Sequence, residues 1–182
     1  TTSIACLQVS KELLFPIPYS LFPECLAGHS LGEYSALVCA GGIEFKEALR
    51  LVQKRAQFMQ EEAEKHPTGM MAILGLERDR IERVCREESV EVANINCPGQ
   101  IVISGLLECL EKAGQKAIDL GAKRVIPLAV NGAFHSSFMK PAQEKLAEVL
   151  AVAGIKNLKV PVIANITARP IIANEAVCFA TS

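Results

Sequence analysis

A serine stands between two glycines in the pentapeptide GHSLG (residues 28–32), which follows a short apolar run and precedes a helix-like run. In a nucleophile elbow, a serine lies on a sharp turn between a strand and a helix, and glycines permit the tight backbone. The Ser30 hydroxyl would then attack a carbonyl carbon, while the Leu31 N–H and the positive end of the helix face the developing oxyanion. The alternative is structural, because Ser30 as an N-cap and Glu33 three residues later would form a capping box. The pattern alone leaves both interpretations open.

A serine nucleophile needs a base, and the chain contains three histidines. His29 is adjacent to the serine on the predicted turn, so its side chain should point elsewhere. His66 precedes a proline in a loop and should be exposed. His135 follows a strand end and a turn and is predicted to open a helix, where the local positive potential keeps an imidazole neutral. His135 is therefore the candidate base, and the alternative is a histidine that caps or satisfies a loop.

Arg55 lies on the apolar side of a predicted helix at 45–65. On a helical wheel the apolar arc covers roughly 180°, and Arg55 falls inside it. Its neighbours on the wheel are Leu51 and Phe58 on one side and Ala48 and Met59 on the other. A cation facing a core needs an anionic partner, since a buried unpaired charge is very costly. That partner is either an internal group, such as a carboxylate or helix carbonyls, or the carboxylate of a substrate, which a guanidinium binds with two parallel hydrogen bonds.

The composition excludes several classes of protein. The chain has 182 residues, half of them hydrophobic, which suits one α/β domain with a small insert. With 19 basic and 20 acidic residues, no overall charge favours nucleic acid or an anionic membrane. No apolar stretch approaches the roughly 20 residues of a membrane span, and no secretory segment opens the chain. We expect a cytoplasmic or organelle-matrix protein.

Seven cysteines are present, an odd number without a C-x-x-C pair, and most stand in apolar runs. This usage predicts buried, reduced thiols rather than a disulfide framework. The histidines are not spaced with the cysteines as zinc ligands would be, so no metal site is expected. The cysteines are Cys6, Cys25, Cys39, Cys85, Cys97, Cys109 and Cys178.

The elements that must position these residues follow from periodicity and turn signals. Outside the middle of the chain, we predict helices at 2–14, 31–41, 45–65 and 135–154 and strands at 24–27 and 160–167. Between them, we predict strands at 69–76, 90–96, 101–105 and 122–130, helices at 78–88 and 107–121, and a Pro-Gly turn at 97–100. The middle order, βαββαβ, is the split βαβ or ferredoxin-like motif. We therefore predict a catalytic domain of residues 1–67 and 131–182, interrupted by an insert of residues 68–130.

Three longer segments contain most of the residues discussed above: AGHSLGEYSALVCAGGIEFKEALRLVQKRAQFMQ, NINCPGQIVISG and GAFHSSFMKPAQEKL. They resemble the malonyl-CoA:acyl carrier protein transacylases of fatty-acid synthesis and the acyltransferase domains of polyketide synthases. The resemblance runs from about Thr1 to about Pro170. It implies an α/β-hydrolase-like large domain with a ferredoxin-like insert, which agrees with the prediction from periodicity.

The resemblance also implies roles for individual residues. Ser30 matches the acylated nucleophile, His135 its base, and the Leu31 N–H one oxyanion donor. Arg55 matches the arginine that pairs with the malonyl carboxylate, and Met59 is expected to line the same substrate site.

Five further residues match the family with supporting roles. Asn96 and Gln100 match a loop that lines the pocket. Phe134 precedes the histidine, where a phenylalanine accompanies malonyl rather than methylmalonyl selectivity. Lys123 and Arg124 match a basic patch that meets the carrier protein.

The implied activity is transfer of a malonyl group from CoA to the phosphopantetheine thiol of acyl carrier protein, through a serine acyl-enzyme. CoA thioester and phosphopantetheine are substrates, so no cofactor is expected, and we expect a monomer or a part of a larger synthase. Two alternatives stay open: a serine hydrolase or thioesterase of the α/β-hydrolase type, and an inactive carrier-binding fragment. Arg55 favours the transferase, because a simple esterase does not need a core-facing cation.

The chain departs from the family at both ends. The family opens with a strand and a Gly-Gln-Gly loop that supplies the second oxyanion donor, and nothing similar precedes Thr1. It also continues past Pro170 through a Pro-x-x-Trp segment with the glutamine that orients the histidine, whereas this chain has no tryptophan. We therefore expect an incomplete form of the catalytic domain.

Overall fold

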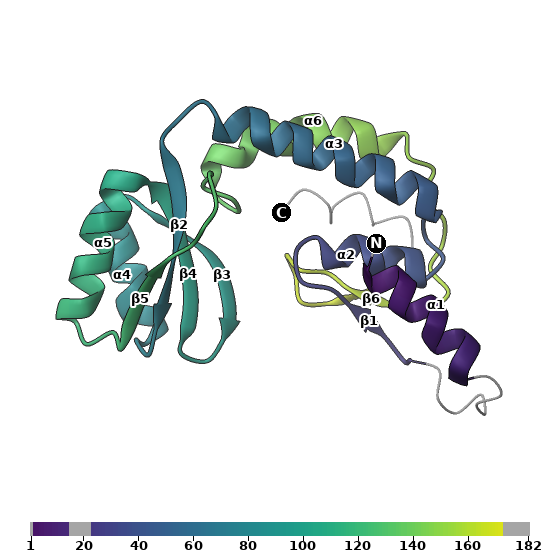
Figure 1. Ribbon diagram of the computed structural model, residues 1–182, viewed down its shortest axis with the longest axis horizontal. Coiled ribbons are helices and arrows are strands. Elements are labelled where there is room, and N and C mark those ends of the chain that lie inside the picture. Colours follow the sequence, from purple (N-terminus) through teal and green to yellow (C-terminus); the bar gives the residue numbers. More distant parts are fainter. Residues whose placement is uncertain (1, 15–22, 173–182) are drawn as a thin grey trace. The chain divides into compact units, whose positions relative to one another are not determined.

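The computed structural model describes residues 2–14 and 23–172 (Figure 1). Its helices and strands alternate as an α/β fold, and they divide into two compact units, residues 1–56 with 143–182 and residues 57–142. The unit boundaries fall within two long helices, α3 (Phe45–Ala63) and α6 (Lys140–Ala151). All strands expected for the insert at 68–130 lie in the second unit.

The first unit is built around a small sheet with the strand order β1-β6-β7. Strands β1 and β6 are parallel, with Leu26 opposite Val162, and β7 is antiparallel to β6. Helix α2 follows β1 directly and packs against β1, β6 and α1. The bounds are α1 Thr2–Leu14, β1 Leu26–Ala27, α2 Gly32–Cys39, β6 Val162–Ile163 and β7 Pro170–Ile171. The parallel pairing brings the carboxyl ends of β1 and β6 to one edge of the sheet.

The second unit holds a four-stranded sheet in which every neighbouring pair of strands is antiparallel. The strand order is β3-β4-β2-β5, and the order along the chain is the predicted βαββαβ. The Pro98-Gly99 turn that joins β3 to β4 is also as predicted, with Gly99 in the left-handed region at φ +78°. The bounds are β2 Thr68–Leu74, α4 Arg78–Glu88, β3 Glu91–Cys97, β4 Gln100–Leu106, α5 Leu107–Asp119 and β5 Arg124–Pro127.

Apolar side chains pack on both faces of this sheet. Alternate residues of β2 point to opposite faces, so this strand contributes to both packing layers. On one face, Met71, Ile73 and Ile103 form a core with apolar residues of α4 and α5 (Figure 1). On the other face, Met70, Ala72 and Val102 pack against apolar side chains of the segment 128–134. Strand β2 is consequently buried along all but its last residue.

Several predicted elements are shorter than expected. The strand expected at 160–167 is limited to Val162–Ile163, because Ala164 instead closes a turn in which the Ala168 N–H donates to its carbonyl. The strand expected at 122–130 ends at Pro127, although the Leu128 N–H still donates to the Met70 carbonyl at 3.0 Å. Helix α1 is confirmed over Thr2–Leu14.

The prediction of buried thiols is wrong for most of the cysteines that the structure describes. Only Cys85 is buried, and burial raises the pKa of its thiol to about 11. Cys6, Cys25 and Cys97 are exposed. Apolar neighbours in sequence do not bury a side chain that faces outward on a helix or at a hairpin end. Cys178 lies outside the described residues.

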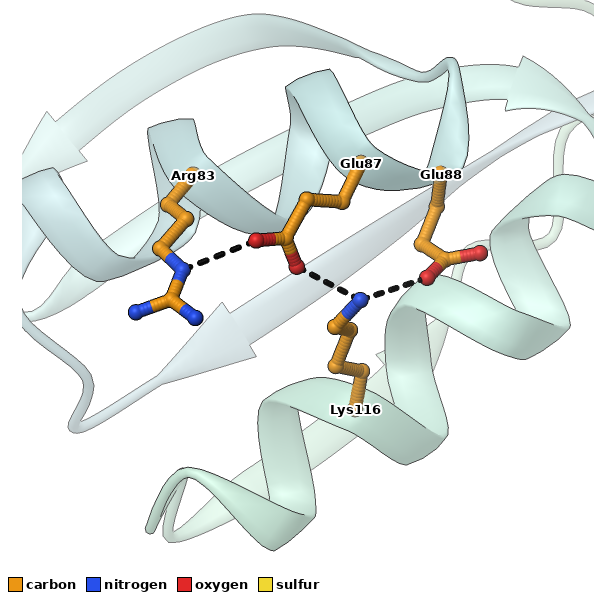
Figure 2. Close-up of polar contacts among 4 residues, drawn as sticks. All are labelled: Arg83, Glu87, Glu88 and Lys116. Carbon is orange, nitrogen blue, oxygen red and sulfur yellow. Dashed lines mark hydrogen bonds and ion pairs between the residues drawn. The ribbon is translucent and has the colours of Figure 1, made fainter.

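Two helices of the second unit are joined by a chain of ion pairs (Figure 2). On α4, Arg83 Nε donates to Glu87 at 2.8 Å. Across to α5, Lys116 Nζ lies 2.5 Å from Glu87 Oε2 and 2.8 Å from Glu88 Oε1. These hydrogen bonds from Arg83 and Lys116 lower the pKa of Glu87 to about 2.

We expect the Glu87 pairs to stabilise the fold only above the ordinary carboxyl range. The folded pKa of about 2 lies below the ordinary value of 4.5, so the contribution is present above pH 4.5 and is lost as the pH falls toward 2. Glu87→Gln should give a small decrease in Tm at neutral pH, since these groups are exposed. The decrease should vanish near pH 2. Glu111→Gln, an exposed glutamate on α5, is the control; an equal decrease there would contradict the pairing.

No helix among the residues that the structure describes is both long enough and apolar enough to cross a membrane.

Candidate active site

Ser30 occupies a sharp turn between β1 and α2, as the elbow hypothesis requires. Its φ is +49°, in the left-handed region that non-glycine residues rarely adopt. The N–H of Gly32 donates to the His29 carbonyl at 2.9 Å, and the N–H of Glu33 donates to the Ser30 carbonyl at 3.0 Å. The serine hydroxyl is thereby presented at the start of α2, where the helix dipole favours negative charge.

The capping-box interpretation of Ser30 is wrong. Leu31 is the N-cap of α2, and no side chain caps the helix. In a capping box the Glu33 carboxylate would accept from the Ser30 N–H. Instead, the Ser30 N–H donates to Asn165 Oδ1 at 3.1 Å, and Glu33 Oε1 accepts from the Asn165 N–H at 3.0 Å.

The two glycines of the pentapeptide meet different surroundings. A Cβ on Gly28 would lie 2.1 Å from the carbonyl carbon and oxygen of Gly32, far inside van der Waals contact. The absence of a side chain at Gly28 therefore allows the backbone before Ser30 to lie close to the backbone of Gly32. A Cβ on Gly32 would meet no atom within 4 Å among the residues that the structure describes. Only the first glycine is demanded by the turn.

Arg55 reaches the nucleophile from α3. Its Nη2 donates to Ser30 Oγ at 3.2 Å, and the guanidinium is partly buried. Within residues 2–14 and 23–172, no carboxylate lies within ion-pair distance of Arg55. Burial lowers the pKa of Arg55, and electrostatic interactions with the nearby Tyr34 and Glu33 oppose that shift. The helical wheel correctly placed Arg55 inward, and its guanidinium retains hydrogen-bond donors for an anion next to Ser30.

Two neighbours of Ser30 on α2 were not recognised as site residues from the sequence. Glu33 is only 4% exposed, and burial raises its pKa although bonds from Asn165 oppose the rise. Tyr34 is equally buried, and its hydroxyl has no partner among the described residues. Burial raises the pKa of Tyr34 to about 12. Glu33 could have been recognised as a charged residue on the apolar side of a short helix. The capping-box interpretation instead assigned it a structural role.

The Leu31 N–H is available for the expected oxyanion role. Leu31 follows Ser30 on the turn, and its backbone conformation is helical at φ −53° and ψ −30°. Its N–H has no hydrogen-bond partner in the described part of the chain, whereas the N–H groups of Gly32, Glu33 and Tyr34 close the first turn. An unpaired N–H beside the nucleophile is the geometry of an oxyanion donor.

His135 belongs to the second unit and does not open a helix. Its φ is +58°, and it lies in a turn before the short 3-10 helix η2 (Ser137–Met139), which leads into α6. The predicted helix start at His135 is wrong because Ser136 is extended, at φ −130° and ψ 175°. The Ser136 hydroxyl donates to the Ala133 carbonyl at 2.6 Å, and the Ser137 N–H donates to Glu91 at 3.1 Å.

Phe134 lies beside His135 and is held against the sheet. Its ring packs on the face formed by Met70, Ala72 and Val102. The neighbouring Ala133 N–H donates to Thr68 Oγ1 at 3.0 Å, which ties this turn to the first residue of β2. His66 is exposed, as predicted, and its ring contacts Phe138 edge-on with centroids 5.7 Å apart.

Two hairpin residues, Asn96 and Gln100, were predicted to line the pocket. They lie at the end of the four-stranded sheet opposite to the turn that contains His135. Gln100 is opposite Leu74, the last residue of β2, and Asn96 is in an irregular part of β3 near the turn. The seven residues of β2 span about 20 Å, so Asn96 and Gln100 are not brought together with His135.

The remaining predicted site residues are placed as follows. Lys123 and Arg124 are exposed at the start of β5, and the Lys123 side chain packs against Gly75. Met59 is partly buried on α3, one turn after Arg55. Among the described residues, no group of three or more His, Cys, Asp or Glu side chains could hold a metal ion.

Two known proteins with similar sequences carry the same name. A malonyl CoA-acyl carrier protein transacylase of Bacillus subtilis is 50% identical over 173 residues, which are 92% of this chain and 53% of that protein. One from Staphylococcus aureus is 42% identical over 184 residues, covering 97% of this chain and 58% of that protein. The chain thus spans about half the length of these curated relatives.

Solved structures give the same result. A type II PKS acyl-carrier protein in complex with its malonyl-transacylase matches with a TM-score of 0.90 and 42% identity, over 98% of this chain and 58% of that chain. The Coxiella burnetii malonyl CoA-acyl carrier protein transacylase matches with a TM-score of 0.91 and 37% identity, over 98% and 56%. The family model described as acyl transferase domain matches residues 4–181. With its serine turn and nearby arginine, this chain belongs to the acyl transferase domain family.

Proposed function

We propose that this protein transfers a malonyl group from CoA to the phosphopantetheine thiol of an acyl carrier protein, through an acyl-enzyme on Ser30. The observation that carries the proposal is the 3.2 Å hydrogen bond from Arg55 Nη2 to Ser30 Oγ. In a malonyl ester, only two carbon–carbon bonds separate the acyl carbon from the carboxylate carbon. A cation that binds this carboxylate must therefore lie within a few ångströms of the nucleophile, and Arg55 does.

The proposed reaction proceeds in two half-reactions. His135 accepts the Ser30 hydroxyl proton as Oγ attacks the thioester carbonyl carbon, and the Leu31 N–H stabilises the oxyanion. The carbon–sulfur bond then breaks, and CoA leaves as a thiol with the proton from His135. In the second half, His135 accepts the proton of the carrier thiol, and the sulfur attacks the carbonyl carbon of the ester. The bond from that carbon to Ser30 Oγ then breaks, and Oγ regains its proton from His135.

The other predicted residues enter this proposal in supporting roles. Met59 would line the substrate site near Arg55, and Asn96 and Gln100 would line the part of the substrate path farther from His135. The exposed Lys123 and Arg124 would meet the carrier protein. For the fold, we propose an α/β-hydrolase-like domain with a ferredoxin-like insert. Strand β1 followed by the elbow and α2 supports the first, and the antiparallel order β3-β4-β2-β5 supports the second. We place the activity in the cytoplasm or an organelle matrix.

Phe134 is proposed to set the preference for malonyl over methylmalonyl groups. Its ring is partly buried and packed on the sheet, so it is a fixed obstacle rather than a mobile one. Steric rejection of one methyl group is worth roughly 1–3 kcal/mol, so the preference would be strong but not absolute.

The full protein, incubated with malonyl-CoA and then with holo acyl carrier protein, tests the transferase proposal. We expect one malonyl group per protein molecule by intact mass, followed by its appearance on the carrier thiol. Carrier protein without phosphopantetheine is the control and should stay unmodified. Free malonate released while holo carrier stays unloaded would instead identify a hydrolase.

A further inference from the structure

We propose that Asn165 is a positioning residue that holds the Ser30 turn in its reactive conformation. The proposal rests on the proposed function, since it assumes that Ser30 is acylated. Asn165 follows β6 and is 135 residues away from Ser30 in sequence. The parallel pairing of Ala27 with Ile163 places the residues after β1 beside the residues after β6. This pairing brings Asn165 alongside the serine turn.

Asn165 forms three hydrogen bonds to the turn and to the helix that follows it. Its Oδ1 accepts from the Ser30 N–H at 3.1 Å. Its Nδ2 donates to the Gly28 carbonyl at 2.7 Å. Its backbone N–H donates to Glu33 Oε1 at 3.0 Å. One residue therefore holds the start of the turn, the nucleophile, and the buried carboxylate of α2.

The chemistry of these partners explains why an asparagine stands here. A backbone N–H can only donate and a carbonyl can only accept, so Ser30 and Gly28 together require one acceptor and one donor. The side-chain amide supplies both, and its orientation follows from the two partners. An ionised aspartate has the same shape but would set an oxygen against the Gly28 carbonyl, losing one bond and adding repulsion.

Ser30 needs such a restraint because its backbone is strained. A left-handed φ at a non-glycine residue persists only when the surrounding structure holds it. The turn also fixes the Ser30 hydroxyl and the Leu31 N–H relative to each other, and both must be aligned when the oxyanion forms. Releasing the Asn165 bonds would let this alignment vary while the β1–β6 pairing stays in place. A misplacement of about 1 Å can cost roughly 100-fold in rate.

Single-turnover acylation of the full protein by malonyl-CoA, followed by intact mass, tests the proposal. For Asn165→Ala and Asn165→Asp we expect the rate constant of acylation to fall about 10- to 100-fold. The final extent should stay at one malonyl group per molecule, because every folded molecule still reacts. The apparent KM for malonyl-CoA should change much less than the maximal rate. Asn157→Ala removes an exposed asparagine of the same unit and should behave as the wild type.

The possible results distinguish a wrong role for Asn165 from a wrong assignment of the malonyl transfer itself. A merely structural role predicts a lower final extent with an unchanged rate constant, because only the folded fraction would react, and at the normal rate. That result, or normal rates in both variants with unchanged Tm, would overturn the role of Asn165. Failure of the wild type to take up any malonyl group would instead overturn the proposed function. The near-isosteric Asn165→Asp keeps the test decisive if Asn165→Ala folds poorly.

Discussion

Ser30→Ala is expected to abolish covalent malonyl uptake and to reduce carrier loading about 10⁴-fold or more. The oxygen that would carry the acyl group is lost, and no neighbouring hydroxyl takes its place on the turn. The fold should survive, since the substitution keeps the backbone N–H of residue 30, which donates to Asn165, and its carbonyl, which accepts from the Glu33 N–H. Intact mass after incubation with malonyl-CoA measures the first effect, and Tm the second.

Ser35→Ala is the matched control, because Ser35 lies on the same helix α2. That variant should take up one malonyl group as the wild type does. Stoichiometric malonyl labelling that persists in Ser30→Ala would show that another side chain is the nucleophile, and the elbow assignment would fail.

Arg55→Ala is expected to invert the ranking of acyl groups. Without the guanidinium, the malonyl carboxylate would lie in a partly buried site without its charged partner. Such a loss costs about 3 kcal/mol, a factor of about 100 in kcat/KM for malonyl-CoA. Acetyl-CoA carries no carboxylate, so its transfer should be kept or should rise. Measuring both kcat/KM values and Tm on the same preparation gives the comparison.

Two further variants sharpen this test. Arg55→Lys should recover only part of malonyl transfer, since an ammonium cannot make the planar, paired contact of a guanidinium. Arg50→Ala removes an exposed arginine of the same helix that pairs with Glu47, and it should leave the ranking unchanged. An equal fall for malonyl and acetyl groups in Arg55→Ala, with Tm intact, would rule out the carboxylate role.

The parts of this site that local patterns encode could be predicted from the sequence. The glycine-flanked serine between a strand and a helix indicated either a nucleophile elbow or a capping box at Ser30, and the first is what the structure shows. Helical periodicity predicted that Arg55 faces inward. Both predictions depend on a few neighbouring residues, whose backbone preferences and spacing are fixed by the chain itself. The order of strands around 68–130 was predictable for the same reason, since each strand ends in its own turn signal.

The parts that depend on distant pairing could not be predicted. The role of Asn165 follows from the parallel register of β1 and β6, two strands of two residues each, which no pattern in either segment specifies. The helix start expected at His135 was wrong, because the extended Ser136 and the bond from the Ser137 N–H to Glu91 are fixed by a strand some 46 residues away. Asn96 and Gln100 were assigned to the pocket from the family resemblance, and nothing in the sequence indicated that their hairpin lies at the end of the sheet away from His135.

The unequal surroundings of the two glycines bear on how such proteins are recognised in genomes. A search pattern that demands G-x-S-x-G treats both glycines as diagnostic. In this fold the backbone forbids any side chain at position 28, whereas position 32 opens onto unfilled space among the described residues. Alanine or serine at position 32 should therefore preserve the turn, and a strict pattern would miss any sequence that carries one of them.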